Sequence, residues 1–511
     1  MKRWLVVLLA VAVVGIGAAF YLRKKPLAPR PQPLAVLFTC DVRGRLVPCG
    51  CFTGQLGGLT RIATLFGKDD APDELRVDVG DAIAGGADFE RIEYRYIQEA
   101  FAKMRYAALN VGWREAGLSA AQLHEIKAHA AVPMVSANLL DKATGAPLFD
   151  THQIVRRGAW RIALVGVMDG RGIGDALGEG LAVEEMNVAL GKVLPKLRGQ
   201  ADFIVLLAFA DETAMANLAR QFYELDVILG GKVQQPSQKL VLENRSVILA
   251  TTNEARAVGT LNVRLISPGK IEAVKGEVTL VSDRIPQDEE IAALATAYRA
   301  EVRQTKLAID DPAKLAEDMV PGVKATAAYA GTQSCAGCHA TAVKAWQGSG
   351  HARAFATLVA FKADADPNCI ACHTVGFGKA SGYRREFGEA KLVDVGCESC
   401  HGPGGAHVEQ RRAGGEVTAR FHPTGAGDCR KCHHGEFSRP FDYDNFWAFV
   451  AHGKESAWKS FPKSAKDPAT KGALEDAAMQ RTLEEIRART GEKVEPPRKP
   501  ASDPLDQFRL K

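Results

Sequence analysis

This sequence lacks a large excess of either charge, and it has few long apolar runs. The 511 residues carry 65 Lys and Arg against 60 Asp and Glu, a formal net charge of +5. No stripe of basic residues interleaved with aromatic ones is present, so the sequence gives no support for a nucleic-acid partner. Outside one N-terminal segment, no run is apolar enough to cross a bilayer. We therefore expect a soluble body, and its length suggests two domains.

The N-terminal segment is the one long apolar run. Residues 4–22 form an uninterrupted apolar stretch with basic residues on both sides, long enough to cross a bilayer as a helix. Residues 1–25 are predicted to be a signal anchor, while small residues at 17–19 leave a cleaved signal peptide as the alternative. Either one exports the rest of the chain, so the body is expected on the periplasmic side of the cytoplasmic membrane. Residues 26–33 hold four prolines and are predicted to be a stiff spacer.

Cysteine is concentrated in one part of the chain. Eight of the eleven cysteines form four Cys-x-x-Cys pairs, each followed by His: Cys335, Cys338 and His339; Cys369, Cys372 and His373; Cys397, Cys400 and His401; Cys429, Cys432 and His433. This pattern is the attachment signature of haem c. Two thiols three positions apart can bond to the vinyl groups on one porphyrin edge, and the next residue places an imidazole under the iron. One pair alone would also suit a zinc half-site or a redox dithiol. Four pairs, all followed by His, predict four covalent haems with these histidines as proximal ligands.

Methionine is missing between residues 320 and 453, which excludes Met as an axial ligand there and predicts low reduction potentials. Histidine is available instead, because five further histidines lie in this part of the chain: His351, His407, His422, His434 and His452. The stretches 346–354 (WQGSGHARA) and 395–407 (VGCESCHGPGGAH) resemble the tetrahaem cytochrome c-554 family. The resemblance covers about 330–455 and implies that His351 and His407 are distal iron ligands.

The remaining distal positions are predicted from availability. His422 and His452 are the best candidates for the other two haems, whereas His434 directly follows a proximal histidine and is predicted to be only a neighbour. Glycine and proline are frequent between the motifs, which favours a small, loop-rich, mostly helical domain wrapped around packed porphyrins.

The part of the chain in front of these motifs has a different pattern. Short apolar runs such as 34–39, 162–167 and 203–207 alternate with amphipathic stretches such as 91–104 and 184–197. This alternation predicts an α/β domain with buried strands. Residues 247–281 are then expected to form antiparallel strands, followed by a helix at 288–303.

Several motifs in this front domain resemble metallophosphoesterases of the 5′-nucleotidase type. The resemblance rests on residues 39–46, 57–61, 79–85, 136–139 and 229–234, and it implies an α/β/β/α sandwich with two metal ions that clamp an attacking water and a phosphate. Most positions of the family's metal ligands are changed here, to Arg43, Trp113, Arg114, Ala208, Lys232 and Gln234, and only Asp41 and Asp81 remain. Fixed positive charge should repel two dications. The domain is therefore predicted to be an inactive phosphoesterase, with no catalytic residues and no second metal.

Three further cysteines lie near the start of the front domain, at Cys40, Cys49 and Cys51. In an oxidising compartment one disulfide with a spare thiol is the favoured arrangement. A soft-metal site and simple burial are the alternatives.

The predicted organisation is a front domain at 34–306, a linker at 307–326, a C-terminal tetrahaem domain at 327–455 and a charged, partly disordered tail at 456–511. The predicted function is electron transfer by an exported cytochrome, with the front domain used for docking or ligand binding. Its partners would be redox proteins or the quinone pool, and the cytoplasmic membrane. The alternatives are a multihaem oxidoreductase that acts on a small substrate and a working nucleotidase fused to a cytochrome.

Overall fold

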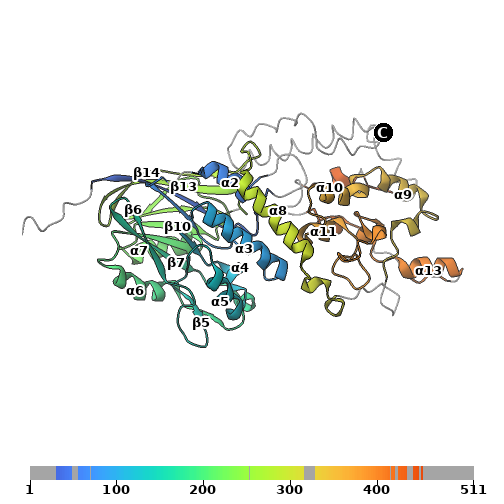
Figure 1. Cartoon of the computed structure of the whole chain (residues 1–511), viewed down its shortest axis with the longest axis horizontal. Helices are drawn as coiled ribbons and strands as arrows, with labels where there is room; N and C mark the ends of the chain where they lie inside the picture. The colour runs from blue at the N-terminus through green and yellow to red at the C-terminus, as the bar shows by residue number, and fades with distance from the viewer. Residues whose placement is uncertain are drawn as a thin grey trace, which may run out of the picture.

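The computed structural model describes residues 30–48, 56–68, 71–252, 254–315, 328–414, 416–419, 424–433, 441–447 and 450–452. They form a mixed α/β front domain and a smaller C-terminal domain of short helices, and Figure 1 shows helix α8 lying between the two. The mixed α/β class predicted for the front domain is confirmed. The predicted anchor at 1–25, His422, His434, Cys49, Cys51 and the tail at 456–511 lie outside the described residues.

Two six-stranded sheets form the front domain. The first contains, in spatial order, β14 (Lys270–Leu280), β13 (Ala257–Ser267), β1 (Gln32–Thr39), β2 (Glu74–Asp78), β3 (Ala108–Asn110) and β4 (Met134–Val135). The second contains β11 (Val241–Glu243), β12 (Ser246–Ala250), β10 (Val227–Gly231), β9 (Phe203–Phe209), β7 (Trp160–Met168) and β6 (His152–Arg157). A separate two-stranded ribbon pairs β5 (Leu139–Asp141) with β8 (Leu181–Val183).

Most of each sheet is parallel, and this fixes where the functional loops lie. Strands β1 to β4 are mutually parallel, and so are β7, β9, β10 and β12. The stretch 247–281 is predicted to form antiparallel strands. Strands β13 and β14 are antiparallel, and β12 is antiparallel to β11 but parallel to β10, so the prediction holds only on one side of β12. Parallel strands bring their carboxyl ends to one edge of a sheet, where loop residues from different strands meet.

The side chains of the second sheet alternate between two cores. Leu164 and Leu207 belong to the core that both sheets share, whereas Val165 and Leu206 face helices α6 (Met186–Leu197) and α7 (Glu212–Gln221). Successive side chains of a strand point to opposite faces, so continuous apolar strands must be covered on both sides. The other helices of the front domain are α2 (Leu59–Phe66), α3 (Asp88–Lys103), α4 (Trp113–Ala116), α5 (Ala120–His129) and α8 (Glu289–Gln304).

Helix α8 is amphipathic and joins the two domains. Asp288 caps its first turn by accepting a hydrogen bond from the backbone N–H of Ile291 at 3.1 Å. Its buried residues, which include Leu294, Tyr298 and Val302, recur at helical spacing. This stripe belongs to the front-domain core and packs on α3 (Figure 1).

The C-terminal domain has a small apolar core of its own. Its helices are α9 (Ala340–Gln347), α10 (Ala354–Ala360), α11 (Pro367–His373), α12 (Cys397–His401), α13 (Gly405–Ala413), α14 (Ala426–Cys429) and α15 (Tyr443–Trp447). The buried apolar cluster among the described residues of this domain comprises Tyr329, Leu358, Ala363, Ile370, Val375, Tyr383 and Leu392. Seven side chains are few for a domain of this length, so stabilisation from another source is needed.

A buried ion pair fastens this domain to the end of α8. The side chains of Arg385 and Asp310 are 6% and 4% exposed, and the guanidinium also donates to the carbonyls of Val302, Thr305 and Ala365 at 3.0 Å. These acceptors come from α8, from the segment after it and from the C-terminal domain. One guanidinium therefore joins three parts of the chain.

No helix among the described residues is long and apolar enough to cross a membrane. The apolar run that motivates the anchor prediction precedes those residues.

We expect Arg385→Ala to lower the free energy of unfolding by about 3–5 kcal/mol, because it leaves the buried Asp310 carboxylate without its partner. The matched control is Arg303→Gln, which removes a half-exposed ion pair with Asp364 on the same face of the interface and should cost at most about 1 kcal/mol. Urea unfolding of both variants measures the difference. Equal losses of unfolding free energy in the two variants would show that the Arg385–Asp310 pair contributes no more than a surface ion pair.

Candidate functional site

The Cys-x-x-Cys-His motifs adopt helical turns. The second and third motifs lie in α11 and α12, and the fourth begins at the last residue of α14. In the first and fourth motifs the histidine N–H donates to the carbonyl of the first cysteine, at 2.9 Å for His339 and 2.8 Å for His433. Residues three and four apart lie on one face of a helix. Both thiols and the imidazole are thus presented together, as attachment to a porphyrin edge requires.

Three motif histidines face a second histidine from a distant part of the chain. The ring centroids are 6.4 Å apart for His339 and His407, 6.0 Å for His351 and His433, and 5.8 Å for His401 and His452. A metal–imidazole bond is about 2.0–2.1 Å long, and about 1 Å separates the nitrogen from its ring centre, so two imidazoles on opposite sides of one metal have centroids roughly 6 Å apart. The three pairs have the separation that a shared iron requires.

Hydrogen bonds at Nδ1 orient several of these rings. His373 Nδ1 lies 2.6 Å from the carbonyl of Ala354, and His452 Nδ1 lies 2.8 Å from the carbonyl of Val450. A carbonyl only accepts, so Nδ1 carries the hydrogen and Nε2 keeps its lone pair for a metal. Burial also lowers the pKa of His373, which favours the neutral ring that binds metals.

His373 differs from the other motif histidines, because no described histidine stacks opposite its ring. His422, the fourth predicted distal ligand, lies outside the described residues. Of the four predicted distal ligands, the structure therefore brings three to a motif histidine: His351, His407 and His452.

The motifs pack against one another. The Cys335 thiol lies beside that of Cys397, which raises its pKa, and the Cys432 thiol lies beside that of Cys372, which does the same. Cys400 also lies near Cys429 and Cys432. The first motif therefore neighbours the third, and the fourth neighbours both the second and the third. A cavity of about 700 Å³ adjoins the second, third and fourth motifs and is also lined by His351 and His452. Its size and its lining of thiols and imidazoles fit the attachment of haem.

Glu398 is a structural residue that the sequence analysis did not identify. It lies between the cysteines of the third motif, is buried, and accepts hydrogen bonds from the backbone N–H groups of Ala330, Gly331 and Gly404 at 2.8, 2.7 and 2.6 Å. It fixes the start of the domain and the loop after His401 to the third motif. A charged residue between two cysteines is normally expected to be exposed, so the sequence carried no signal of this role.

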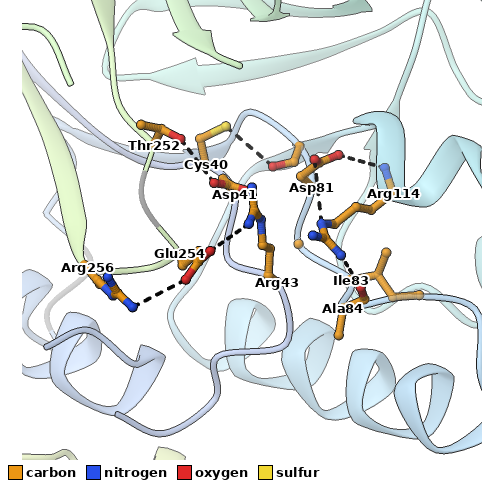
Figure 2. Close-up of polar contacts among 12 residues, drawn as sticks. Cys40, Asp41, Arg43, Asp81, Ile83, Ala84, Arg114, Thr252, Glu254 and Arg256 are labelled. Carbon is orange, nitrogen blue, oxygen red and sulfur yellow. Dashed lines mark hydrogen bonds and ion pairs between the residues drawn. The ribbon is translucent and has the colours of Figure 1, made fainter. Parts of the chain in front are cut away.

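The second candidate site lies where the parallel strands of the front domain end. Asp41 follows β1, and its carboxylate pairs with the guanidinium of Arg43 and accepts from Thr252 Oγ1 at 3.1 Å (Figure 2). Arg43 also pairs with Glu254 at 2.6 Å. Arg43, predicted to stand in place of a ligand histidine, therefore pairs with Asp41, one of the two aspartates predicted to remain.

Asp81 follows β2 and is held in the same way. It accepts from the backbone N–H of Arg114 at 2.8 Å, and the guanidinium of Arg114 lies 4.0 Å from its other oxygen (Figure 2). Buried Glu115 anchors the Asp81 loop by accepting from the N–H groups of Asp81, Ala82 and Ile83 at 2.8–3.0 Å. Burial, and then the Glu115 carboxylate, raises the pKa of Asp81 to about 8, although Arg114 opposes the rise.

Lys232, after β10, forms the third internal pair. Its ammonium lies 3.5 Å from buried Asp169 and 3.8 Å from the centre of the Trp113 ring. Arg171 pairs with the same aspartate at 2.8 Å. The sequence analysis did not single out Asp169, which follows β7 and marks this corner of the site. Arg43 and Lys232 thus each pair with a carboxylate of the chain, whereas Arg114 lies beside the Asp81 carboxyl group, whose raised pKa favours its neutral form.

The backbone at this site is strained. Asp41, Arg43, Asp81 and Lys232 all have positive φ, between 48° and 60°, which costs energy in residues with a side chain and tends to cluster at functional sites. Yet across the residues that the structure describes, no group of three or more His, Cys, Asp or Glu side chains is arranged to hold a metal ion. The loops keep left-handed backbone conformations, while acidic side chains between them, such as Asp41 and Asp169, pair with basic side chains of the chain.

The three predicted thiols of the front domain are only partly described. Cys40 is a free, fully buried thiol whose Sγ donates to the carbonyl of Gly80 at 3.5 Å. Burial, with nearby Asp78 and Asp41, raises the pKa of this thiol. Simple burial, one of the alternatives, therefore describes Cys40 in the structure.

The chain is similar to known proteins of two kinds, and the first kind is cytochromes. The family model described as cytochrome c554 and c-prime matches residues 334–402, which contain the first three motifs. Cytochrome c-554 of Nitrosomonas europaea is 34% identical over 108 residues, 18% of this chain and 46% of the relative. The chain thus spans less than half of that relative's length.

Solved structures similar to the chain include nucleotidases. The 5′-nucleotidase precursor of Thermus thermophilus is 20% identical, with a TM-score of 0.46, over 53% of this chain and 59% of its own. NAD nucleotidase of Haemophilus influenzae is 14% identical, with a TM-score of 0.47, over 60% and 64%. Sulfate thiohydrolase SoxB of Thermus thermophilus is 17% identical, with a TM-score of 0.46, over 61% and 67%.

The raised pKa of Asp81 predicts how stability depends on pH. The folded state keeps a proton that the unfolded state releases above its ordinary pKa of 3.8, so this contribution to stability is full below that value and is lost as pH rises through about 8. The urea midpoint should therefore fall between about pH 5 and about pH 8, and it should fall less in Asp81→Asn. Identical pH profiles for the two proteins would mean that Asp81 is ionised throughout, as a metal ligand would be.

Proposed function

We propose that this chain is an exported tetrahaem c-type cytochrome that transfers electrons on the periplasmic side of the cytoplasmic membrane. The observation that carries the proposal is the set of three imidazole pairs, each combining a motif histidine with a distant histidine at 5.8–6.4 Å. The match of residues 334–402 to the cytochrome c554 family model supports a c-type cytochrome. The fourth haem rests on the fourth motif in the sequence, which lies beyond the matched residues.

Each motif has a defined part in the proposal. The first haem would be held by His339 and His407, the third by His401 and His452, and the fourth by His433 and His351. The second would be held by His373, with His422 as its predicted distal ligand. Two imidazoles and no methionine favour a low reduction potential.

The contacts between motifs support electron transfer among the haems. Cys335 lies beside Cys397, and Cys372 lies beside Cys432, so the attachment points of neighbouring haems are side by side. Bound haem supplies reversible one-electron chemistry at its iron.

The front domain has a supporting function in this proposal. Its three internal ion pairs leave no described cluster of ligands for a metal pair, so we assign it a docking or ligand-binding role without hydrolysis. Redox proteins or the quinone pool would deliver and remove the electrons, and an N-terminal helix would anchor the protein to the membrane.

A second function is favoured if the second haem keeps an open face. His373 is the one motif histidine without a facing histidine among the described residues. An open axial position is what a multihaem oxidoreductase would use to bind a small substrate.

The spin states of the irons test the ligand assignment. Intact mass should show four covalent haems, and EPR should show low-spin iron at all four if His422 completes the second site. His407→Ala, His351→Ala and His452→Ala should each convert one haem to high spin, because each removes one imidazole of a pair. His124→Ala, an exposed histidine of the front domain, is the control. Low-spin spectra in all three variants would refute the pairing, whereas a high-spin signal that binds carbon monoxide in the unmodified protein would favour the oxidoreductase.

The purified full chain should not hydrolyse nucleotides or other phosphate esters, even with added manganese, zinc or cobalt. Arg43 and Lys232 pair with carboxylates at the site, and Arg114 lies beside Asp81, so all three place positive charge where these ions would bind. Metal analysis measures the number of ions bound per chain, and a phosphatase assay measures hydrolysis. Binding of two ions per chain, with turnover that Asp41→Ala abolishes, would contradict the assignment and restore the nucleotidase function.

A further inference from the structure

The cavity beside the second motif is closed partly by the front domain. Its lining includes Cys369, Cys372 and His373 of the second motif, and Arg45, Glu93 and Arg299 of the front domain. Arg45 belongs to the loop after β1, Glu93 lies on α3 and Arg299 lies on α8. Three front-domain elements therefore form a wall of a space that we assign to haem.

Within this wall, the loop that carries Arg45 packs closely against α3. Gly44 has a φ of +73°, and a Cβ at that position would lie 2.5 Å from Oε2 of Glu93. Only glycine avoids both the backbone strain and the collision. The loop is thus held against α3, with Arg45 at the cavity.

The charges around the cavity are arranged in two groups. Arg45 and Arg299 supply two guanidinium groups, and Arg299 also donates to the carbonyl of Phe361 at 3.0 Å. Glu93 and Asp366 supply two buried carboxyl groups, and Tyr298 donates to Asp366 at 3.2 Å.

Burial raises the pKa of both carboxyl groups, and repulsion from Asp366 and Glu90 raises that of Glu93 further, against the opposing effect of Arg45 and Arg299. The two arginines bring positive charge to the wall of the cavity, and positive charge suits the carboxylates of a ligand.

Haem c has two such carboxylates. Its propionates lie on the porphyrin edge away from the vinyl groups that bond to cysteine, and the planar guanidinium binds a carboxylate with two parallel hydrogen bonds. We propose that the front domain completes the pocket of the second haem, with Arg45 and Arg299 binding the propionates of the haem attached at Cys369 and Cys372. This rests on the proposed function, because the propionates are present only if haem c is attached there.

The inference gives the front domain a defined electrochemical role. Positive charge close to a haem favours its reduced form, since reduction adds negative charge. Arg45 and Arg299 would raise the potential of the second haem relative to the same haem with a neutral wall. The front domain would thus set the position of that haem in the electron path.

The test uses the full, matured chain with Arg45→Gln and Arg299→Gln. Spectroelectrochemical titration should show one haem of the four becoming harder to reduce, by up to about tenfold in the equilibrium constant, which is 59 mV for a one-electron couple. The propionate bands in the resonance Raman spectrum should change as well. Arg45→Lys keeps the positive charge, so the potential of the second haem should stay close to that of the unmodified protein. The propionate bands should still change. The affected haem should be the one that His407→Ala, His452→Ala and His351→Ala leave unchanged.

Arg303→Gln is the matched control. Arg303 lies one turn after Arg299 on α8 and contacts the C-terminal domain through Asp364 at 3.1 Å, but it does not line the cavity. If Arg45→Gln and Arg299→Gln both had four haems with the same potentials as Arg303→Gln, the inference would be overturned and the cytochrome function would stay intact. Absence of covalent haem from the unmodified protein would overturn the proposed function itself. If Arg45→Gln fails to mature, Arg299→Gln and Arg45→Lys decide the question.

Discussion

Pairs of imidazole rings about 6 Å apart are the constraint on which the C-terminal domain depends. Each pair joins a motif histidine to a histidine from a distant segment, so a metal held between them closes a long loop of chain. The domain's own apolar cluster is small. Metal ligation and covalent attachment would therefore supply much of its folding free energy, as in other small domains built around a metal. This explains why short helices and glycine-rich loops suffice as a scaffold.

The front domain poses a different physical problem, which is how its buried acidic loops are stabilised. Asp41 pairs with Arg43 and Asp169 with Lys232, while Asp81 has a raised pKa beside Arg114. Four residues there have left-handed backbone conformations. The loop after Asp81 leads into α3, which packs on α8, and α8 ends at the buried Arg385–Asp310 pair. These acidic loops and the placement of the C-terminal domain are thus linked through two helices.

Local patterns in the sequence predicted the parts of this structure that depend on local chemistry. The four motifs, the mixed α/β class and the candidate His452 could be recognised because spacing and availability are visible in the chain, whereas His351 and His407 were implied by the family resemblance. The partner of each histidine could not be recognised, because pairing depends on how separate segments meet. The parallel pairing of β12 was missed for the same reason, since its apolar pattern suits either direction. Glu398, Asp169 and the wall formed by Arg45 and Arg299 gave no signal, because their roles arise only from tertiary contacts.

Anomalous diffraction at the iron edge from crystals of the matured protein would test the central claim most directly. The account predicts four iron positions: one between His339 and His407, one between His401 and His452, one between His351 and His433, and one at His373. Fewer than four irons, or irons bound by residues other than these histidines, would contradict it.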